Sequence, residues 1–370
     1  MPFQPFAIHR AWAGARAMRM FSNSSFHPSS LSPPVRILLD EFSWPPRISC
    51  WSRLRQAPNP RAGDTLSPKN FDHMLVKIAF TRAQQSALLE SNLSMSRLRV
   101  SAISFLNTVP LMWDFEHGPA GADFEITYTL PSSCAAQLLA GSVDIGIIPA
   151  AAYAQIPDLA IVPGVAIGAR GPVRSILLVS QVPVEKIQTI ALDTSSMTSA
   201  ALTKVLFERW LGPGKTYTPM APDLDRMLRH QDACLVIGDR ALEVDRAKHL
   251  TLDLAEEWIR LTGKPFVFAF WAVRRAALAN APSDLAAIFQ ASRDHGTRPE
   301  SIDSIARSWA GRVGLSAAEV RTYLTENIHY QLDPGCLEGL QLFYRYAAEC
   351  GALPPAPALQ FMEIEKFAAT

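Results

Sequence analysis

The sequence predicts an α/β protein with two lobes and a helical C-terminal segment. Apolar strands alternate with helices across short turns, which is the pattern of βαβ units and of largely parallel sheets. Two apolar segments flanked by turn residues, 175–180 (SILLVS) and 266–273 (FVFAFWAV), are the natural crossings between lobes. Beyond them the pattern is almost wholly helical. We therefore expect the chain to leave the first lobe, build the second and return.

The first lobe is expected to begin with three strands separated by helices. Apolar or alternating residues predict these strands at 99–105, 124–130 and 143–149. A short helix suits the segment 110–116. Pro131, Ser132 and Ser133 open the next helix, and Gly141 closes it in the C′ position typical of helix ends.

The middle of the chain repeats this pattern and contains the two crossings. Strands are expected at 175–180, 188–193, 233–238 and 265–274. Helices are expected at 200–211, where Gly212 and Pro213 end the helix, and at 253–263. We assign residues 95–180 plus 268–370 to lobe 1 and residues 181–267 to lobe 2.

The C-terminal helices are expected to begin at recognisable caps. Ser283 is one candidate, and Ser316 stands three residues before Glu319, which is the spacing of a capping box. Asp333 precedes Pro334, and proline is well suited to the first position of a helix.

Residues 1–94 lack the marks of a folded domain. They carry eleven Lys/Arg against five Asp/Glu, and ten of the 28 prolines fall among them. Basic and aromatic residues are scattered without a sustained period. We interpret this stretch as a disordered or spurious extension, and we expect a chain that starts at Met95 to fold and work as well as the full one.

Charge and cysteine content exclude several classes of protein. Residues 95–370 carry 24 Lys/Arg against 29 Asp/Glu, and this mildly acidic balance argues against nucleic acid as a partner. The five cysteines form no CxxC pair, so neither a zinc site nor a disulfide framework is indicated. No apolar export signal or membrane segment stands out. We expect a cytoplasmic protein with reduced thiols.

Three hydroxyl-rich turns follow predicted strands. Ser104 and Asn107 follow the first strand, Ser132 and Ser133 the second, and the run 194–199, with Thr198 and Ser199, follows strand 188–193. Helix N-termini offer free backbone N–H groups and a partial positive charge, which suit a carboxylate or a phosphate. Each hydroxyl taken alone could be only a helix cap. Turns at corresponding places in both lobes favour an anion-binding cleft between them.

Other polar residues near the expected cleft support weaker hypotheses. Arg170 and Arg174 flank the first crossing, where either could reach an anionic ligand or simply lie at the surface. Asp193 and Asp239 stand at the ends of strands, where each could act as a base or simply cap a turn. The histidines show no metal-ligand spacing, and the chain has no GxGxxG, Walker or GxSxG motif. We therefore expect neither a metal nor a cofactor.

Six segments resemble the chorismate dehydratase family (MqnA) of the futalosine route to menaquinone. They are SFLNTVPL at 104–111, LLAGSVDIGIIPAAAY at 138–153, GPVRSILLVS at 171–180, ALDTSSMTSAAL at 191–202, LVIGDRAL at 235–242 and EEWIRLTGKPFVFAFW at 256–271. The resemblance begins at about Arg97 and covers none of residues 1–94. It implies a fold similar to the type II periplasmic binding proteins, which is a two-lobed clamshell.

The resemblance also implies a reaction, the removal of water from chorismate to give 3-[(1-carboxyvinyl)oxy]benzoate. Chorismate has two carboxylates, which match paired anion-binding turns, and a planar diene ring, which suits apolar walls. Hydrogen bonds to the ring carboxylate would stabilise the dienolate formed when the C3 proton leaves. Loss of the C4 hydroxyl completes an aromatic ring, so the reaction needs no cofactor.

On this reading we expect Asn107 and Asp193 to be catalytic. The expected substrate-binding residues are Ser104, Ser132, Ser133, Arg174, Ser175, Thr198 and Ser199. The base stays open: the proton leaves either to a carboxylate of the substrate or to an aspartate at the cleft. Asn107 could also donate to the departing hydroxyl.

Two alternatives stay open. A sister family of the same pathway, 1,4-dihydroxy-6-naphthoate synthase, shares the fold and the hydroxyl-rich turns, and a histidine in the cleft would favour it. The second alternative is a non-catalytic binding protein for an anionic organic acid, which would need export from the cell.

Overall fold

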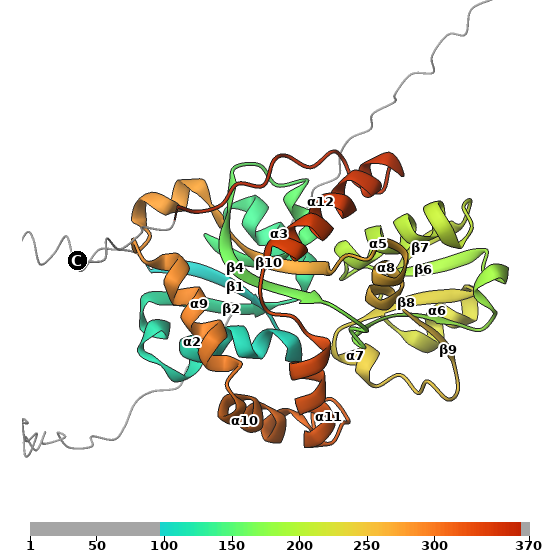
Figure 1. Ribbon diagram of the computed structural model, residues 1–370, viewed down its shortest axis with the longest axis horizontal. Helices are drawn as coiled ribbons and strands as arrows, with labels where there is room; N and C mark the ends of the chain where they lie inside the picture. The colour runs from blue at the N-terminus through green and yellow to red at the C-terminus, as the bar shows by residue number, and fades with distance from the viewer. Residues whose placement is uncertain (1–96, 364–370) are drawn as a thin grey trace, which may run out of the picture. The chain divides into compact units, whose positions relative to one another are not determined.

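The computed structural model describes residues 97–363, which form two five-stranded sheets with helices around them (Figure 1). The proposed extension 1–94 and the start at Met95 lie outside the described residues. No helix within 97–363 is both long and apolar enough to span a lipid bilayer.

The first sheet has the strand order β2-β1-β3-β10-β4. Its strands are β1 (Leu98–Ile103), β2 (Phe124–Thr129), β3 (Ile145–Pro149), β4 (Leu159–Ala169) and β10 (Phe266–Arg274). Strand β1 pairs in parallel with β2 and with the central strand β3, whereas β10 runs antiparallel to β3 and β4.

The second sheet has the order β7-β6-β8-β5-β9. Its strands are β5 (Ile176–Ser180), β6 (Thr189–Asp193), β7 (Thr216–Met220), β8 (Ala233–Ile237) and β9 (Leu250–Asp253). Strand β6 is parallel to β7 and β8, and β5 is antiparallel to β8 and β9.

Helices cover both sheets and form the C-terminal segment. The α-helices are α2 (Trp113–His117), α3 (Pro131–Ala140), α4 (Ala150–Tyr153), α5 (Thr198–Leu206), α6 (Leu224–His230), α7 (Asp239–Leu242), α8 (Leu254–Thr262), α9 (Leu285–Gly296), α10 (Pro299–Trp309), α11 (Ala317–Thr322) and α12 (Pro334–Glu349). The 3-10 turns are η1 (Leu106–Met112), η2 (Pro119–Asp123), η3 (Val184–Lys186) and η5 (Arg275–Asn280). Two π-helical turns, η4 (Phe207–Leu211) and η6 (Tyr323–Asn327), continue α5 and α11.

The α/β class and the helical C-terminal segment are confirmed, but the sheets are mixed rather than largely parallel. The reason is the path of the chain between the lobes. Strands β1, β3, β6 and β8 end at the edge where the two sheets face each other, whereas β5 and β10 begin at that edge because the chain has just crossed over. A strand that enters at the edge where its neighbours end must run opposite to them.

Two expected boundaries also differ from the structure. Strand β5 lies inside the second sheet, between β8 and β9, so the first crossing precedes Ile176 instead of following residue 180. The return crossing ends before Phe266, where β10 rejoins the first sheet.

Helix α9 is preceded by Asp284 and not by Ser283. The capping box of Ser316 with Glu319 and the Asp333 cap are both present.

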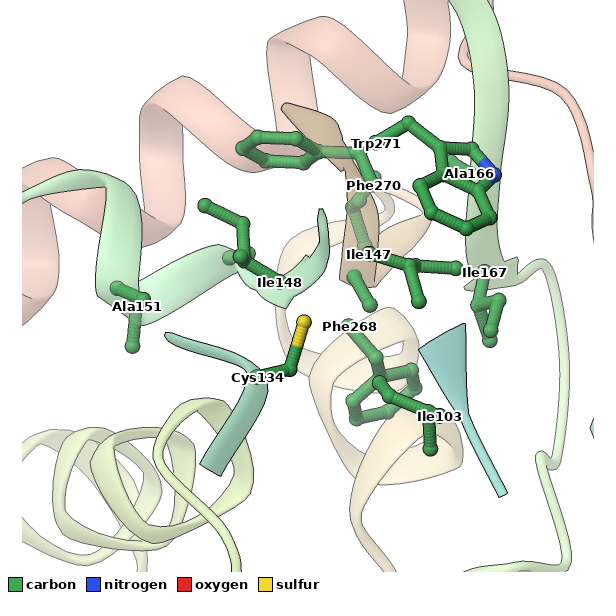
Figure 2. Packing of buried hydrophobic residues seen from close by; sticks show 14 of the residues in the cluster. Ile103, Cys134, Ile147, Ile148, Ala151, Ala166, Ile167, Phe268, Phe270 and Trp271 are labelled. Atoms are coloured by element: carbon green, nitrogen blue, oxygen red, sulfur yellow. The ribbon is translucent and has the colours of Figure 1, made fainter. Parts of the chain in front are cut away.

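The core of the first lobe is centred on β10, where every side chain from Phe266 to Val273 is buried. Figure 2 shows Phe270 and Trp271 on opposite faces of this strand, as the alternation of a strand requires. The Phe270 ring packs on Tyr153 with centroids 5.8 Å apart, and Trp271 packs on Phe289 at 4.8 Å. Both faces of β10 are therefore covered, which explains its continuous apolar run.

The first crossing, at 170–175, is held by backbone hydrogen bonds to one carboxylate. Asp253 accepts from the N–H groups of Val173 (3.1 Å) and Arg174 (2.7 Å), and it also caps α8 by accepting from Ala255 and Glu256. The side chain of Asn327 donates to the carbonyl of Pro172 (2.8 Å). The crossing is therefore fixed both to the second lobe and to the C-terminal segment.

The return crossing is braced by α12, which runs across β10 and α5 (Figure 1). Gly339 of α12 lies directly on the backbone carbonyl of Pro265, and a Cβ at 339 would overlap that oxygen. Only glycine allows this close approach of helix and crossing.

We expect Gly339→Ala to lower the free energy of unfolding by about 1–3 kcal/mol, because two backbone segments would have to move apart. Gly311→Ala is the matched control, since a Cβ at 311 meets no atom within 4 Å. That control should change stability by no more than about 0.5 kcal/mol. Urea unfolding of both variants checks the prediction, and equal stability of the two would contradict it.

Candidate active site between the lobes

The carboxyl ends of strands from both sheets meet at one cavity with a volume of about 50 Å³. It is bounded by the turn after β1, by the N-terminal ends of α3 and α5, and by the turn between β8 and α7. The polar side chains that line it are Asn107, Ser196, Thr198 and Ser199. A few polar groups among apolar walls are typical of binding sites for small organic molecules.

The turn between β8 and α7 fits closely against the first lobe. Gly238 has φ 65°, and a Cβ there would lie 2.7 Å from the ring of Phe105. Its N–H donates to the carbonyl of Ser175 (2.8 Å), which ties the turn to the crossing. Glycine is therefore required at 238 both for its φ and for contact between the lobes.

None of the residues from 97–363 that line the cavity is a lysine, an arginine or a histidine. Helices α3 and α5 both begin at the cavity without a side-chain cap. The first N–H groups of a helix have no intrahelical partner and carry a partial positive charge. The cavity can therefore hold carboxylates through backbone N–H groups and hydroxyls, without a formal cation.

Hydrogen bonds between the lobes close the cavity. Leu106 N–H donates to Asp239 Oδ1 (3.0 Å), and Ser132 N–H donates to the carbonyl of Ser195 (3.2 Å). Thr198 Oγ1 accepts from Ala151 N–H (3.1 Å) and donates to the carbonyl of Phe268 (3.0 Å). Thr198 thereby fixes the beginning of α5 to the first lobe.

Of the residues expected to bind substrate or act in catalysis, Asn107, Thr198 and Ser199 line the cavity. Asn107 is only 8% exposed. The hydroxyl of Thr198 is already paired with Ala151 and Phe268 and does not cap its own helix.

Ser104, Ser132 and Ser133 lie in turns around the cavity but do not line it. The Ser104 hydroxyl donates to the carbonyl of Thr129 (3.4 Å), and Ser133 is exposed. Ser132 contributes its backbone N–H to the contact between the lobes.

The structure does not support Asp193 as a catalytic residue. Its side chain is 2% exposed and does not line the cavity, and Oδ1 accepts from the N–H (2.8 Å) and hydroxyl (2.6 Å) of Ser195. Burial raises the pKa of Asp193 while these hydrogen bonds oppose the shift. Asp193 therefore caps the turn that leads into α5.

Arg174 and Ser175 stand at the end of the first crossing, and neither lines the cavity. Arg174 adopts the left-handed conformation at φ 63°, and its charge lowers the pKa of Glu319 together with the Ser316 cap. Ser175 is completely buried, and its hydroxyl has no hydrogen-bond partner.

Sequence patterns did not single out several residues that line the cavity or lie near it. Phe105, Ser196 and Met197 line the cavity beside the expected residues. In the sequence, Asp239 is only an aspartate at the end of a strand, whereas in the structure its carboxylate joins the two lobes. Burial raises the pKa of Asp239 to about 6, and the hydrogen bond from Leu106 lowers it in part. Tyr323 is a neighbour of Asn107. No sequence pattern pointed to it, because a tyrosine within a helix is usually a core residue.

Within residues 97–363, His329, Asp333 and Cys336 are the one group whose ligand atoms lie close enough together for a metal ion. The guanidinium of Arg170 donates to Asp333 Oδ2 (2.6 Å), and the His329 ring lies at 2.6 Å from the same oxygen. The carboxylate is thus already paired with a cation, and the group lies outside the cavity.

Comparisons with known proteins agree with this architecture. A family model described as menaquinone biosynthesis matches residues 98–349. Chorismate dehydratase of Thermus thermophilus is 31% identical over 255 residues, which cover 63% of this chain and 89% of that protein.

Solved structures confirm a fold like that of periplasmic binding proteins. The alkanesulfonate-binding protein of Xanthomonas axonopodis pv. citri, bound to MOPS, has a TM-score of 0.54 and 19% identity, covering 71% of this chain and 96% of its own. A protein of Archaeoglobus fulgidus has a TM-score of 0.54 and 16% identity, covering 70% and 99%. At these identities the likeness concerns the fold alone.

We expect Thr198→Val to lower the free energy of unfolding by about 1–3 kcal/mol, because it leaves Ala151 N–H and the Phe268 carbonyl unpaired in the interior. Thr198→Ser is the matched control, since it keeps the hydroxyl and both hydrogen bonds. Urea unfolding checks the pair. A valine variant as stable as the serine variant would show that the hydroxyl does not fix α5 to the first lobe.

Proposed function

The chain belongs to the menaquinone biosynthesis family, and on that premise we propose that it is a chorismate dehydratase. It eliminates water from chorismate to give 3-[(1-carboxyvinyl)oxy]benzoate. The observation that carries the proposal is the similarity to a chorismate dehydratase along nearly the whole length of that protein. The chemistry of the cavity supports it independently.

The cavity offers what a planar dicarboxylate needs. The uncapped N-terminus of α5 lies at the cavity, where its first N–H groups can hold one carboxylate. At α3, Pro131 has no N–H, so the donor for a second carboxylate is Ser132 N–H, which is released from the Ser195 carbonyl when the lobes open. Phe105, Ile176 and Phe268 supply apolar walls for the ring. The substrate would thus bridge the lobes and hold them together.

The reaction breaks one C–H and one C–O bond. The proton at C3 leaves first, and the electrons spread into the ring carboxylate as a dienolate, which N–H donors stabilise. The C4 hydroxyl then departs with its electron pair and takes up a proton to form water. Asn107 reaches the cavity with a carboxamide that can donate to this hydroxyl.

No side chain that lines the cavity within the described residues is ionisable, which narrows the choice of base. One candidate is a carboxylate of the substrate itself. The other is Asp239, next to the lining residue Gly238, with a pKa of about 6 that burial raises toward the range of a general base. Asp193 is no longer a candidate because its carboxylate is committed to Ser195.

The lobes must separate to admit chorismate. The cavity of about 50 Å³ is much smaller than the roughly 300–1,000 Å³ of typical sites for organic ligands. Opening must break hydrogen bonds that join the lobes, such as those from Leu106 to Asp239 and from Ser132 to Ser195.

No specific observation favours the alternatives. A histidine in the cavity would favour the sister enzyme 1,4-dihydroxy-6-naphthoate synthase, and no lining residue within 97–363 is one. A binding protein for an organic acid would hold chorismate without changing it, so product formation separates the two.

The remaining assignments follow from the proposed reaction. Elimination of water makes the protein a carbon–oxygen lyase, with a place in the futalosine route to menaquinone. We place it in the cytoplasm, where the free thiols of Cys134, Cys234, Cys336 and Cys350 stay reduced.

Incubation of the purified protein with chorismate tests the proposal. We expect an aromatic product with the mass of chorismate less one water, followed by absorbance and mass spectrometry. Chorismate that is bound but recovered intact would favour a binding protein, and a chain that neither binds nor converts it would refute the proposal.

We expect Asn107→Ala to lower kcat by about 100-fold or more, which is the usual effect of removing one donor that acts in the transition state. Asn280→Ala is the matched control, because Asn280 is exposed and lies outside the cavity. Full activity of Asn107→Ala with unchanged KM would remove Asn107 from the site.

A further inference from the structure

Four polar side chains from distant parts of the chain gather behind the cavity. Asn107 comes from the turn after β1, Ser175 from the end of the first crossing, Asp239 from the beginning of α7, and Tyr323 from the end of α11. Of these, only Asn107 lines the cavity itself. The other three form a second layer that touches the site through Asn107 or its backbone.

Tyr323 is completely buried at the first position of the π-helical turn η6. Its hydroxyl makes no hydrogen bond of normal geometry. Burial raises its pKa far above the usual range; Ser175 and Asn107 oppose the shift as hydrogen-bonding neighbours, and the charge of Asp239 adds to it. These three side chains are therefore the polar neighbours of the hydroxyl, and none of them makes a hydrogen bond of normal geometry with it. Single π-helical turns occur frequently at functional sites.

Ser175, like Tyr323, has a buried hydroxyl that makes no hydrogen bond. Its backbone is fully engaged: the N–H donates to Val173 and the carbonyl accepts from Gly238, both at 2.8 Å. Its hydroxyl is buried without a partner. A buried polar group without a partner destabilises the folded protein. Two of them beside the residue that reaches the cavity indicate a site where function outweighs stability.

Asp239 contacts the turn that carries Asn107 through the backbone of the preceding residue, Leu106. Its Oδ1 accepts from the N–H of Leu106, immediately before Asn107, and this bond joins the two lobes. Closure of the lobes therefore brings the Asp239 carboxylate to the Asn107 turn at the same moment as it encloses the cavity.

We propose that Tyr323 and Asp239 are positioning residues for Asn107 in the elimination reaction. When the lobes close, Asp239 fixes the backbone at Leu106 while the Tyr323 hydroxyl, with Ser175, orients the Asn107 carboxamide toward the substrate. On this proposal the base is a carboxylate of the substrate rather than Asp239, and Tyr323 and Asp239 act through the Asn107 turn. This inference rests on the proposed dehydratase function, and it adds a role for the C-terminal helical segment in the site.

The first test is Tyr323→Phe, which removes only the hydroxyl. We expect kcat to fall by about tenfold or more while KM changes less than about threefold, because a misplaced group loses transition-state contacts before ground-state binding. The free energy of unfolding should stay equal or rise, since the lost hydroxyl has no partner.

The matched control is Tyr330→Phe. Tyr330 is buried in the same segment with an unpartnered hydroxyl; it lies near Tyr323 but does not line the cavity. We expect wild-type kcat for this variant. Equal kcat for Tyr323→Phe and the wild type, or equal losses in both tyrosine variants, would overturn the proposal.

The second test separates positioning from proton transfer at Asp239. The amide of Asp239→Asn can still accept from Leu106 N–H, so it should keep most of the activity, whereas Asp239→Ala should lose about tenfold or more in kcat. An asparagine variant as inactive as the alanine variant would overturn the positioning role and assign the carboxylate to proton transfer.

The proposal and the function on which it rests fail in different ways. Failure of the wild-type protein to convert chorismate would refute the function. Conversion by the wild type, with full kcat in Tyr323→Phe and Asp239→Ala, would refute only the positioning role.

Discussion

The Asp253 carboxylate fixes the relation between the crossing and the second lobe, and the site depends on it. It accepts four backbone N–H groups, two from the crossing at Val173 and Arg174 and two from the first turn of α8. Ser175 follows directly, and its carbonyl holds Gly238, so the turn that meets Phe105 is placed through the same carboxylate. One buried acidic group thus sets where the cavity walls from two lobes meet.

Much of the local structure could be predicted from the sequence. Strands such as β1, β2 and β3 and the caps at Ser316 and Asp333 are short-range patterns, and the structure confirms them. The edge strands β7 and β9 were missed: β7 contains Pro219 and alternates weakly, and β9 has only four residues. The place of β5 in the second sheet depends on pairing with β8 and β9 across more than fifty residues, which periodicity does not contain.

The sequence predicted the kind of site better than the roles of its individual residues. Hydroxyl-rich turns at strand ends indicated an anion-binding cleft, and Asn107 and Ser199 line the cavity. A strand-end aspartate such as Asp193 looks the same in sequence whether it caps a turn or reaches a ligand, and in the structure its carboxylate accepts two hydrogen bonds from Ser195. Tyr323 could not be found, since its neighbours Ser175 and Asn107 lie in distant parts of the chain. Contacts between distant segments decided each of these outcomes.

The central claim is that a planar dicarboxylate is held between the lobes by the beginnings of α3 and α5. A crystal structure of the protein with the aromatic product bound tests it most directly. We expect the ligand beside Asn107, with its carboxylates within hydrogen-bond distance of N–H groups in the first turns of these helices. A ligand found instead in the separate cavity between Leu224 and Val244 of the second lobe would contradict the account.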